Sequence, residues 1–218
     1  MKAQWIILIV LGGLLVLGLA AYLAFRKGPD LSSYLPLKEP RLTRKEDERV
    51  LEVEFSGPAD TIIPKAYSVL FKAYYGAKGS PKGPAMKPPK ARYAALADFG
   101  LDARSVAELK AHDWSGAVAI PIPEGLALPD TKPEAEQVAA PLVAKTAVWE
   151  YGDVAEILHL GSYETEPPTI KKLLDFIAAQ GYAIVGDHEE EYLKGPGMFG
   201  VSPKDYWTIV RYRVRKAR

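Results

Sequence analysis

The sequence predicts an α+β domain made of two pseudo-symmetric β-α-β-β units with a central cleft, preceded by one transmembrane helix. Three observations lead to this prediction: a long uncharged run near the N-terminus, short segments of alternating apolar and polar residues, and a faint internal repeat. Alternation indicates half-buried strands, whereas apolar residues three or four positions apart indicate amphipathic helices. The expected boundaries are 1–27 for the anchor, 28–48 for a linker and 49–218 for the domain.

The composition is that of an ordinary globular protein. The 218 residues are 48% hydrophobic and 25% charged, with a formal net charge of +1. A near-neutral chain lacks the basic footprint of a nucleic-acid binder, so we expect no nucleic-acid partner. The chain has no cysteine, which excludes a disulfide framework and a thiolate nucleophile. His112, His159 and His188 lack metal-ligand spacing, and we therefore expect neither a metal nor a cofactor.

Residues 5–25 contain no charged side chain. At about 1.5 Å rise per residue, a helix of this length crosses a hydrocarbon core of roughly 30 Å. A cleaved signal peptide is the competing interpretation, but it needs a shorter apolar core and a more basic start than Lys2 provides. A buried core helix is disfavoured because apolar residues surround the whole helix. The pattern favours a single-pass membrane anchor, and the basic residues after it place the soluble domain in the cytoplasm.

The segment 28–48 carries three prolines and mixed charge without apolar periodicity, which is typical of a spacer. The fold is then expected to begin near Val50. Leu51, Val53 and Phe55 alternate with glutamates, as in a half-buried strand.

An amphipathic helix follows this strand and ends near Gly76, and we expect Tyr67 and Phe71 on its core-facing side. The rest of the first half is expected to contain a loop, a strand, a short helix and a further strand, at 76–90, 91–99, 105–111 and 117–122.

The second half begins with an apolar strand at 154–160, which Gly161 ends. Pro167 and Pro168 suit the first turn of a helix, where the missing amide hydrogens would have no partner. Apolar residues then recur at helical spacing as far as Gly181. Three more strands are expected, at 182–185, 189–193 and 206–214.

The two halves resemble one another. Gly57 lies seven residues before Pro64, and Gly161 lies seven residues before Pro168. In both halves a strand precedes the glycine and an amphipathic helix follows the proline. Such a repeat predicts a pseudo-twofold axis that relates the two units, with the groove between them as the natural binding place.

Three short motifs of the second half resemble GyrI-like small-molecule-binding domains. They are Leu-Gly-Ser-Tyr-Glu at 160–164, Glu-Glu-Tyr-Leu at 190–193 and Pro-Lys-Asp-Tyr-Trp-Thr at 203–208. GyrI-like domains have a SOUL-like fold and also occur as effector-binding domains of AraC-type and MerR-type regulators. The resemblance covers roughly 50–214, and only its second half matches motif by motif. A helix-turn-helix segment is missing, so a role in transcription does not follow.

The resemblance implies a cleft that holds hydrophobic, often cationic compounds between aromatic rings and a buried carboxylate. Glu190 matches that carboxylate, and the candidate ring residues are Tyr192, Trp207, Trp114 and Tyr163. We expect Trp207 on the face of the last strand that is turned away from the helix and toward a ligand. Many relatives have Thr-Glu-Ile in this strand, whereas this chain has Thr-Ile-Val at 208–210, so a second acid is missing and a preference for cations is weakened.

Purely structural roles are alternatives for two of these candidate site residues. The acidic run 189–191 has the character of a solvated segment, and Tyr163 can simply pack beneath the turn. The sequence favours membrane-anchored binding of a small hydrophobic or amphiphilic molecule. The alternatives are a hydrolase of reactive small molecules with Glu190 as general base, and a non-catalytic envelope interaction domain.

Overall fold

The computed structural model describes residues 30–94, 113–126, 141–196 and 201–217. Contacts divide the chain into the units 1–33 and 34–218, and the fold below is that of the second unit. The predicted anchor, 5–25, and the predicted short helix, 105–111, lie outside the described residues. Within the described ranges, no helix combines the length and the apolar character needed to cross a bilayer.

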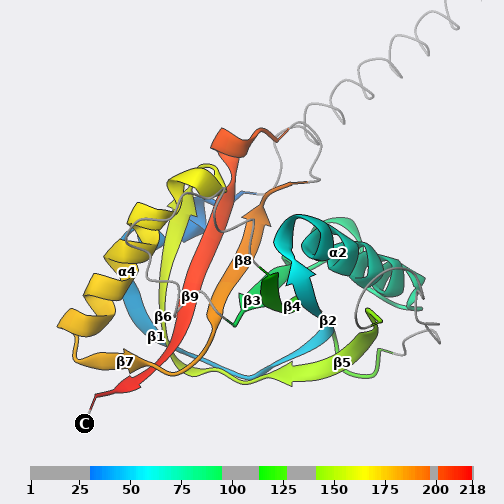
Figure 1. Ribbon diagram of the computed structural model, residues 1–218, viewed down its shortest axis with the longest axis horizontal. Coiled ribbons are helices and arrows are strands. Elements are labelled where there is room, and N and C mark those ends of the chain that lie inside the picture. Colours follow the sequence, from blue (N-terminus) through cyan, green and yellow to red (C-terminus); the bar gives the residue numbers. More distant parts are fainter. Residues whose placement is uncertain (1–29, 95–112, 127–140, 197–200, 218) are drawn as a thin grey trace, which may run out of the picture. The chain divides into compact units, whose positions relative to one another are not determined.

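The described strands form one large antiparallel sheet in the order β1-β6-β9-β8-β3-β4-β2-β5, with β7 paired to β9 (Figure 1). The strands are β1 (Arg41–Lys45), β2 (Glu48–Pro58), β3 (Lys90–Tyr93), β4 (Asp113–Pro121), β5 (Ala144–Trp149), β6 (Gly152–Leu160), β7 (Tyr182–Ile184), β8 (His188–Lys194) and β9 (Trp207–Lys216).

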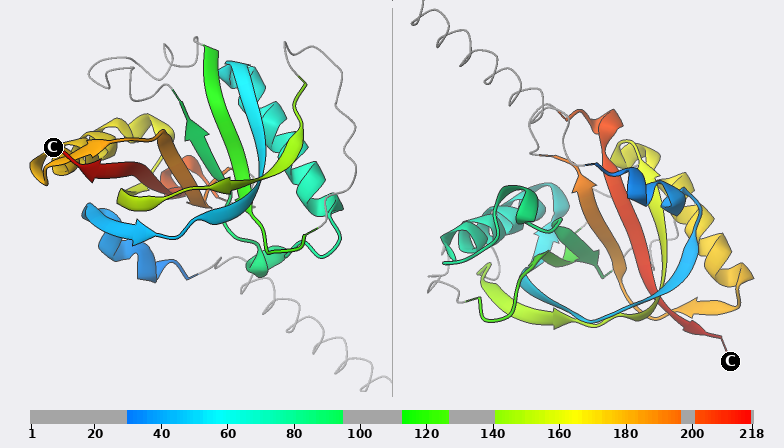
Figure 2. Two further views of the ribbon diagram at one scale, coloured as in Figure 1. Left: turned by 90° about the horizontal axis from the view of Figure 1, so that it is seen from below. Right: turned by 180° about the vertical axis from the view of Figure 1, so that it is seen from behind.

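Two α-helices cover the sheet, α2 (Ala59–Gly76) over β2 and β4, and α4 (Pro167–Ala179) over β6 and β7 (Figure 2). Pro167 and Pro168 occupy the first turn of α4, as their chemistry favours. Short 3-10 helices complete the described elements: η1 (Ser32–Lys38), η2 (Gly83–Ala85), η3 (Tyr163–Thr165) and η4 (Pro203–Asp205).

The two halves have the same order of elements apart from one short strand. The first runs β2-α2-β3-β4, and the second runs β6-α4-β7-β8-β9, where β7 has no counterpart in the described part of the first half. In the sheet the two halves join through the pairing of β3 with β8. Each half is also preceded by a strand that pairs with the other half, since β1 pairs with β6 and β5 pairs with β2. The observed unit is therefore β-β-α-β-β, one strand longer than predicted.

The expected linker, 28–48, belongs to the fold at its C-terminal end. Strand β1 pairs along its whole length with β6, from Arg41 opposite Glu156 to Lys45 opposite Gly152. Its side chains are half-buried or exposed, as is common where charged residues protect an edge strand. Such a strand has no apolar alternation, which is why the sequence indicated a spacer.

The sheet has two unlike faces. The helix face carries the apolar residues that pack under α2 and α4, such as Val53, Val118 and Val210. The far face carries a small apolar cluster around Trp149 and Tyr151 together with many charged side chains. Because successive residues of a strand alternate between faces, neighbouring acids in one strand can lie in quite different surroundings.

Candidate functional site

Strand β8 lies at the middle of the sheet, between β3 and β9. Alternation places His188, Glu190 and Tyr192 on the helix face, where Tyr192 joins the core under α2. Glu189 points to the far face, where it binds Arg211. The acidic run therefore divides between a buried site beneath the helices and an ionic network on the opposite face.

Glu190 is 7% exposed and lies in a chain of hydrogen bonds. Its Oε2 accepts from the Tyr192 hydroxyl at 2.6 Å, and its Oε1 lies 3.1 Å from His188 Nε2. The Tyr93 and Tyr192 hydroxyls are 2.8 Å apart, and His188 Nδ1 is 2.8 Å from the Tyr212 hydroxyl. A carboxylate can only accept, so Tyr192 and His188 both donate toward Glu190, and Tyr93 in turn donates to Tyr192.

Aromatic rings from both halves surround this carboxylate. The ring of Tyr192 meets Tyr67 of α2 edge to face at 6.3 Å and Tyr163 of η3 at 6.1 Å between centroids. Trp114 packs edge to face on Tyr93 at 5.2 Å. Four of the sequence candidates, Glu190, Tyr192, Tyr163 and Trp114, are thus brought into one cluster, with Trp114 one ring removed from the acid.

A second acid enters the cluster from the start of α4. Glu166 directly precedes Pro167 and is 5% exposed. Burial, and then the nearby Glu190 charge, raise the pKa of Glu166 well above its usual value, so the neutral acid is its favoured form. The final strand has no acid at 208–210, as the sequence indicated, but the helix N-terminus supplies one.

Three buried oxygen atoms of the cluster have no hydrogen-bond partner within the described ranges: Tyr67 Oη, Glu166 Oε1 and Thr208 Oγ1. Burial also raises the pKa of the Tyr67 hydroxyl above its usual value. Buried polar groups in proteins are almost always hydrogen-bonded. A cluster that leaves three such groups unsatisfied has the capacity to accept hydrogen bonds from, or donate them to, a bound molecule or water.

Trp207 does not belong to this cluster. Across the β8–β9 pairing Tyr192 lies opposite Thr208, which faces the helices, and Trp207 follows after a register shift, opposite Lys194. Alternation therefore turns Trp207 toward the far face. The expectation that the ligand lies on the face of β9 turned away from α4 does not agree with the position of Glu190, which faces the helices.

Two cavities of the described part of the chain lie apart from Glu190. One described cavity, of about 340 Å³, lies beside the start of α4 and is lined by His159 and Lys38 among others. Another, of about 230 Å³, lies on the far face. Glu190 lines neither. The Glu190 side chain is instead buried beside the ring of Tyr192, which Tyr67 of α2 and Tyr163 of η3 contact edge to face.

The described histidines make ordinary hydrogen bonds. His159 Nε2 donates to the Ser162 carbonyl at 3.0 Å, and its Nδ1 accepts from the Thr169 hydroxyl at 2.9 Å. Burial lowers the pKa of His159, which suits this neutral form. His188 belongs to the Glu190 cluster, and His112 lies outside the described residues. No group of three or more potential ligands in the described part of the chain could hold a metal ion.

Tyr67, Tyr93 and Glu166 were not among the candidate site residues. Tyr67 was expected to serve the core, and neither Tyr93 nor Glu166 was singled out. The available signal for Glu166 was its place immediately before two prolines that open a helix. The signal for Tyr93 is its position opposite His188, which depends on the pairing of two strands far apart in the sequence.

Comparison with known proteins identifies the fold. A hydrolase from Listeria innocua superposes with a TM-score of 0.62 at 17% identity, covering 85% of this chain and 96% of its own. An uncharacterized conserved protein from the same organism gives 0.60 at 18% identity, covering 85% and 97%. The C-terminal domain of EcmrR gives 0.50 at 14% identity, covering 82% and 98%.

The chain has a GyrI-like fold. No protein-family model matches the sequence, and no curated protein matches it either. At identities of 14–18% the likeness establishes the fold alone, and the role of the Glu190 cluster depends on its own chemistry.

Proposed function

We propose that this protein binds a small hydrophobic or amphiphilic molecule on the helix face, between α2 and α4, with Glu190 as the charged contact. The observation that supports this most strongly is the combination of a buried carboxylate, a surrounding set of tyrosine rings and three unsatisfied oxygens. A purely structural core would replace such groups with apolar ones, because unsatisfied buried polar groups destabilise a fold.

The chemistry of the cluster suits a flat apolar molecule that carries a donor or a positive charge. Each cation placed over a ring gains about 0.5 to 2 kcal/mol, more when water is excluded. Glu190 adds a charge-assisted hydrogen bond, worth roughly 1.5 to 3 kcal/mol. Glu166, as a neutral acid, offers both a donor and an acceptor. The ligand enters when Tyr67 and Tyr163 swing aside, and its rings take their place against Tyr192.

The GyrI-like fold agrees with this proposal, since the resemblance implies an effector cleft between the two halves. From the sequence we further propose that residues 5–25 hold the domain at a membrane and that the domain faces the cytoplasm. Because the chain has no cysteine, a single cysteine replacing Lys216 reports its side of the membrane. An impermeant maleimide should label Lys216→Cys only after the cells are opened, and Ala3→Cys in intact cells; the opposite pattern contradicts the proposed orientation.

A hydrolase is the second candidate, and the pair Glu166 and Glu190 is the observation that favours it. Two carboxyl groups in one buried region, one of them with a raised pKa, resemble an acid and base pair. One solved structure of the same fold is described as a hydrolase. In such a reaction Glu190 would take a proton from water as the water attacks an electrophilic carbon, and Glu166 would protonate the leaving group.

A panel of probes separates these functions. The full-length chain in lipid nanodiscs is incubated with tetraphenylphosphonium, a neutral apolar dye and strained electrophiles, and both bound and converted compound are measured. Saturable binding without conversion supports the binding function. Conversion of a probe supports the hydrolase if the Glu190→Gln variant is as stable as wild type but no longer converts the probe. Absence of both would overturn each proposal and leave an interaction domain.

A further inference from the structure

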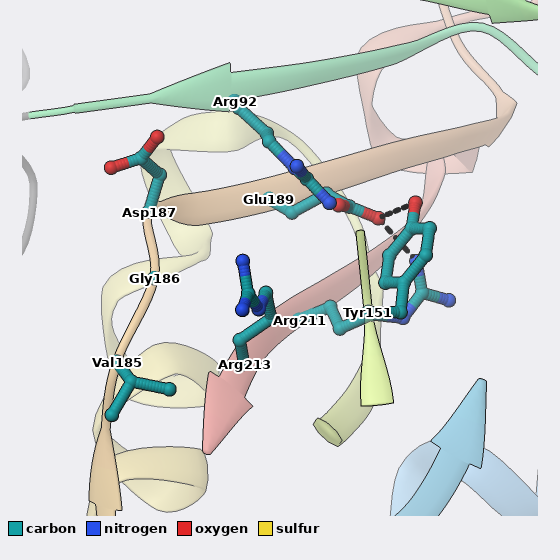
Figure 3. A pocket seen from close by; sticks show the side chains of 8 residues that line it. All are labelled: Arg92, Tyr151, Val185, Gly186, Asp187, Glu189, Arg211 and Arg213. Carbon is teal, nitrogen blue, oxygen red and sulfur yellow. Dashed lines mark hydrogen bonds and ion pairs between the residues drawn. The ribbon is translucent and has the colours of Figure 1, made fainter. Parts of the chain in front are cut away.

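The far face of the sheet contains a cavity of about 230 Å³ that is separate from the Glu190 cluster (Figure 3). It lies where β9 and the start of β8 approach the side chain of Arg92. Its charged lining comprises Arg92, Arg211, Arg213, Asp187 and Glu189. Three guanidinium groups around one small volume indicate a negatively charged ligand. This holds only for an arginine whose hydrogen-bond donors are not already paired with Asp187 or Glu189.

Glu189 is saturated by protein donors. Its Oε1 accepts from the Tyr151 hydroxyl at 2.9 Å and from Arg211 Nη1 at 2.6 Å, and its Oε2 accepts from Arg92 Nε at 2.8 Å. Burial raises the pKa of Glu189, but Arg211 and Arg92 outweigh this effect and hold the pKa below its usual value. Glu189 therefore stays ionised, and its charge is already balanced by two of the three arginines.

Arg213 is the arginine with unmet donor capacity. Its Nε is buried and has no hydrogen-bond partner within the described ranges. Its ion pair with Glu150 is long, 4.0 Å from Nη1 to Oε2, and the Glu150 side chain is 73% exposed. An ion pair of this kind contributes little. The Arg213 head group lies between Asp187 on one side of the cavity and Tyr151 on the other (Figure 3).

Gly186 leaves room for the aliphatic part of the Arg213 side chain. A Cβ on Gly186 would come 3.0 Å from the Arg213 Cβ and 3.3 Å from its Cδ, closer than side chains normally approach. Only a residue without a side chain lets the arginine lie flat against this segment. A side chain at position 186 would therefore shift the aliphatic stem of Arg213 and with it the guanidinium at the cavity.

We propose that this cavity is a binding site for a small oxyanion, a carboxylate or a phosphate group, held by the fork of Arg213. A planar guanidinium matches the two oxygens of such a group. Arg92 and Arg211 line the same cavity but are already paired, Arg92 with Glu189 and Arg211 with three glutamates, so Arg213 is the arginine that holds the anion. The volume is below the range of about 300 to 1,000 Å³ typical of pockets for drug-sized ligands, so the site takes a single small group. Asp187 lies at the same cavity and offers a partner for an ammonium group carried by the ligand.

Three probes at constant ionic strength test the site: inorganic phosphate, acetate and glycine. Each is titrated into the full-length chain in nanodiscs, with the arginine side-chain NMR signals and the unfolding temperature as readouts. We expect saturable shifts of the Arg213 Nε signal and a rise in unfolding temperature with ligand concentration. If glycine binds more tightly than acetate, and Asp187→Asn removes this difference, the ligand is zwitterionic. If phosphate binds more tightly than either, the ligand carries a phosphate group.

Matched variants separate a built site from general attraction of anions. Arg213→Gln should weaken binding about tenfold or more, the loss expected when a charge-assisted pair of hydrogen bonds is removed. Arg44→Gln, which removes an equal charge from an exposed position on β1, should leave it unchanged. If Arg213→Gln fails to fold, Gly186→Ala tests the same geometry by displacing the arginine. Equal affinities in all variants, or no saturable binding of any probe, would overturn the proposal.

Discussion

Glu166 combines two opposing influences at the start of α4. A helix N-terminus favours a negative charge by about 0.3 to 1 kcal/mol at an exposed site. Burial of a charge costs several kcal/mol, and Glu166 is buried beside a second acid. The burial effect is the larger, which explains why the pKa of this acid is raised although helix starts usually stabilise carboxylates.

We expect Glu166→Gln to stabilise the protein in a pH-dependent way. The pKa of Glu166 is raised above 4.5 in the folded state, so its contribution to stability is fully present below the unfolded pKa and is lost as pH rises through the folded pKa. The free energy of unfolding of the variant, relative to wild type, should therefore increase from pH 4 to pH 8 in urea titrations. A pH-independent difference would contradict this account. Glu124→Gln, at an exposed position, is the control.

At the scale of elements, β3 and β4 approach each other unusually closely. Gly116 lies opposite Tyr93, and a Cβ at this glycine would lie 2.0 Å from the Arg92 carbonyl oxygen and 3.1 Å from the ring of Phe55. A side chain cannot be accommodated there without moving β3. Because Tyr93 on β3 donates to Tyr192, this close approach also positions the hydrogen-bond chain that leads to Glu190.

Gly116→Ala should therefore lower the free energy of unfolding by about 1–3 kcal/mol, the usual cost of overpacking. Ser115→Ala, an exposed position in the same strand, should change it by less than about 0.5 kcal/mol. Urea unfolding of both variants provides the measurement. Equal stability of Gly116→Ala and wild type would mean that β3 is not held where the structure places it.

The elements also show what could be predicted from the sequence. Strands β6 and β9 and helix α4 follow apolar patterns that are visible locally, and the glycine at 161 ends β6 as expected. Strand β1 is charged, and β5 alternates only weakly, so neither has a local signal. Their pairing with the opposite half depends on contacts about 90 to 115 residues away in the sequence. The Glu190 site was predicted from a sequence motif. The role of Glu166 could not be predicted locally, because it depends on the packing of α4 over β6.

Across the whole molecule, the two faces of the sheet respond oppositely to pH. On the far face, burial raises the pKa of Glu156 and Glu189, but the neighbouring cations together outweigh burial and lower both, Arg211 with Arg41 at Glu156 and Arg211 with Arg92 and Lys90 at Glu189. Acids with a lowered folded pKa contribute stability above the unfolded pKa, and this stability is lost as pH falls through the folded pKa. Glu166 on the helix face shows the reverse, so stability should decrease at both acidic and basic pH.

Replacing one acid of the far-face network should reduce the sensitivity to acid. Wild type should lose stability as the pH falls below about 4.5, the usual pKa of these acids. Glu189→Gln should be less stable than wild type at pH 7, because Arg211 and Arg92 lose a partner. Its stability should also fall less between pH 5 and pH 3. Parallel pH profiles of the two proteins in urea unfolding would contradict the assignment of this network.

The most direct test of the binding site compares two neighbouring acids that face opposite sides of the sheet. The affinity of the full-length chain for tetraphenylphosphonium, the cationic probe, is measured for wild type, Glu190→Gln, Glu189→Gln and Trp207→Phe, after each is shown to be folded. We expect Glu190→Gln to weaken binding about tenfold or more, as loss of a charge-assisted contact implies, and the other two variants to bind within about twofold of wild type. Equal losses for Glu189→Gln and Glu190→Gln, or full affinity in Glu190→Gln, would contradict a ligand site on the helix face.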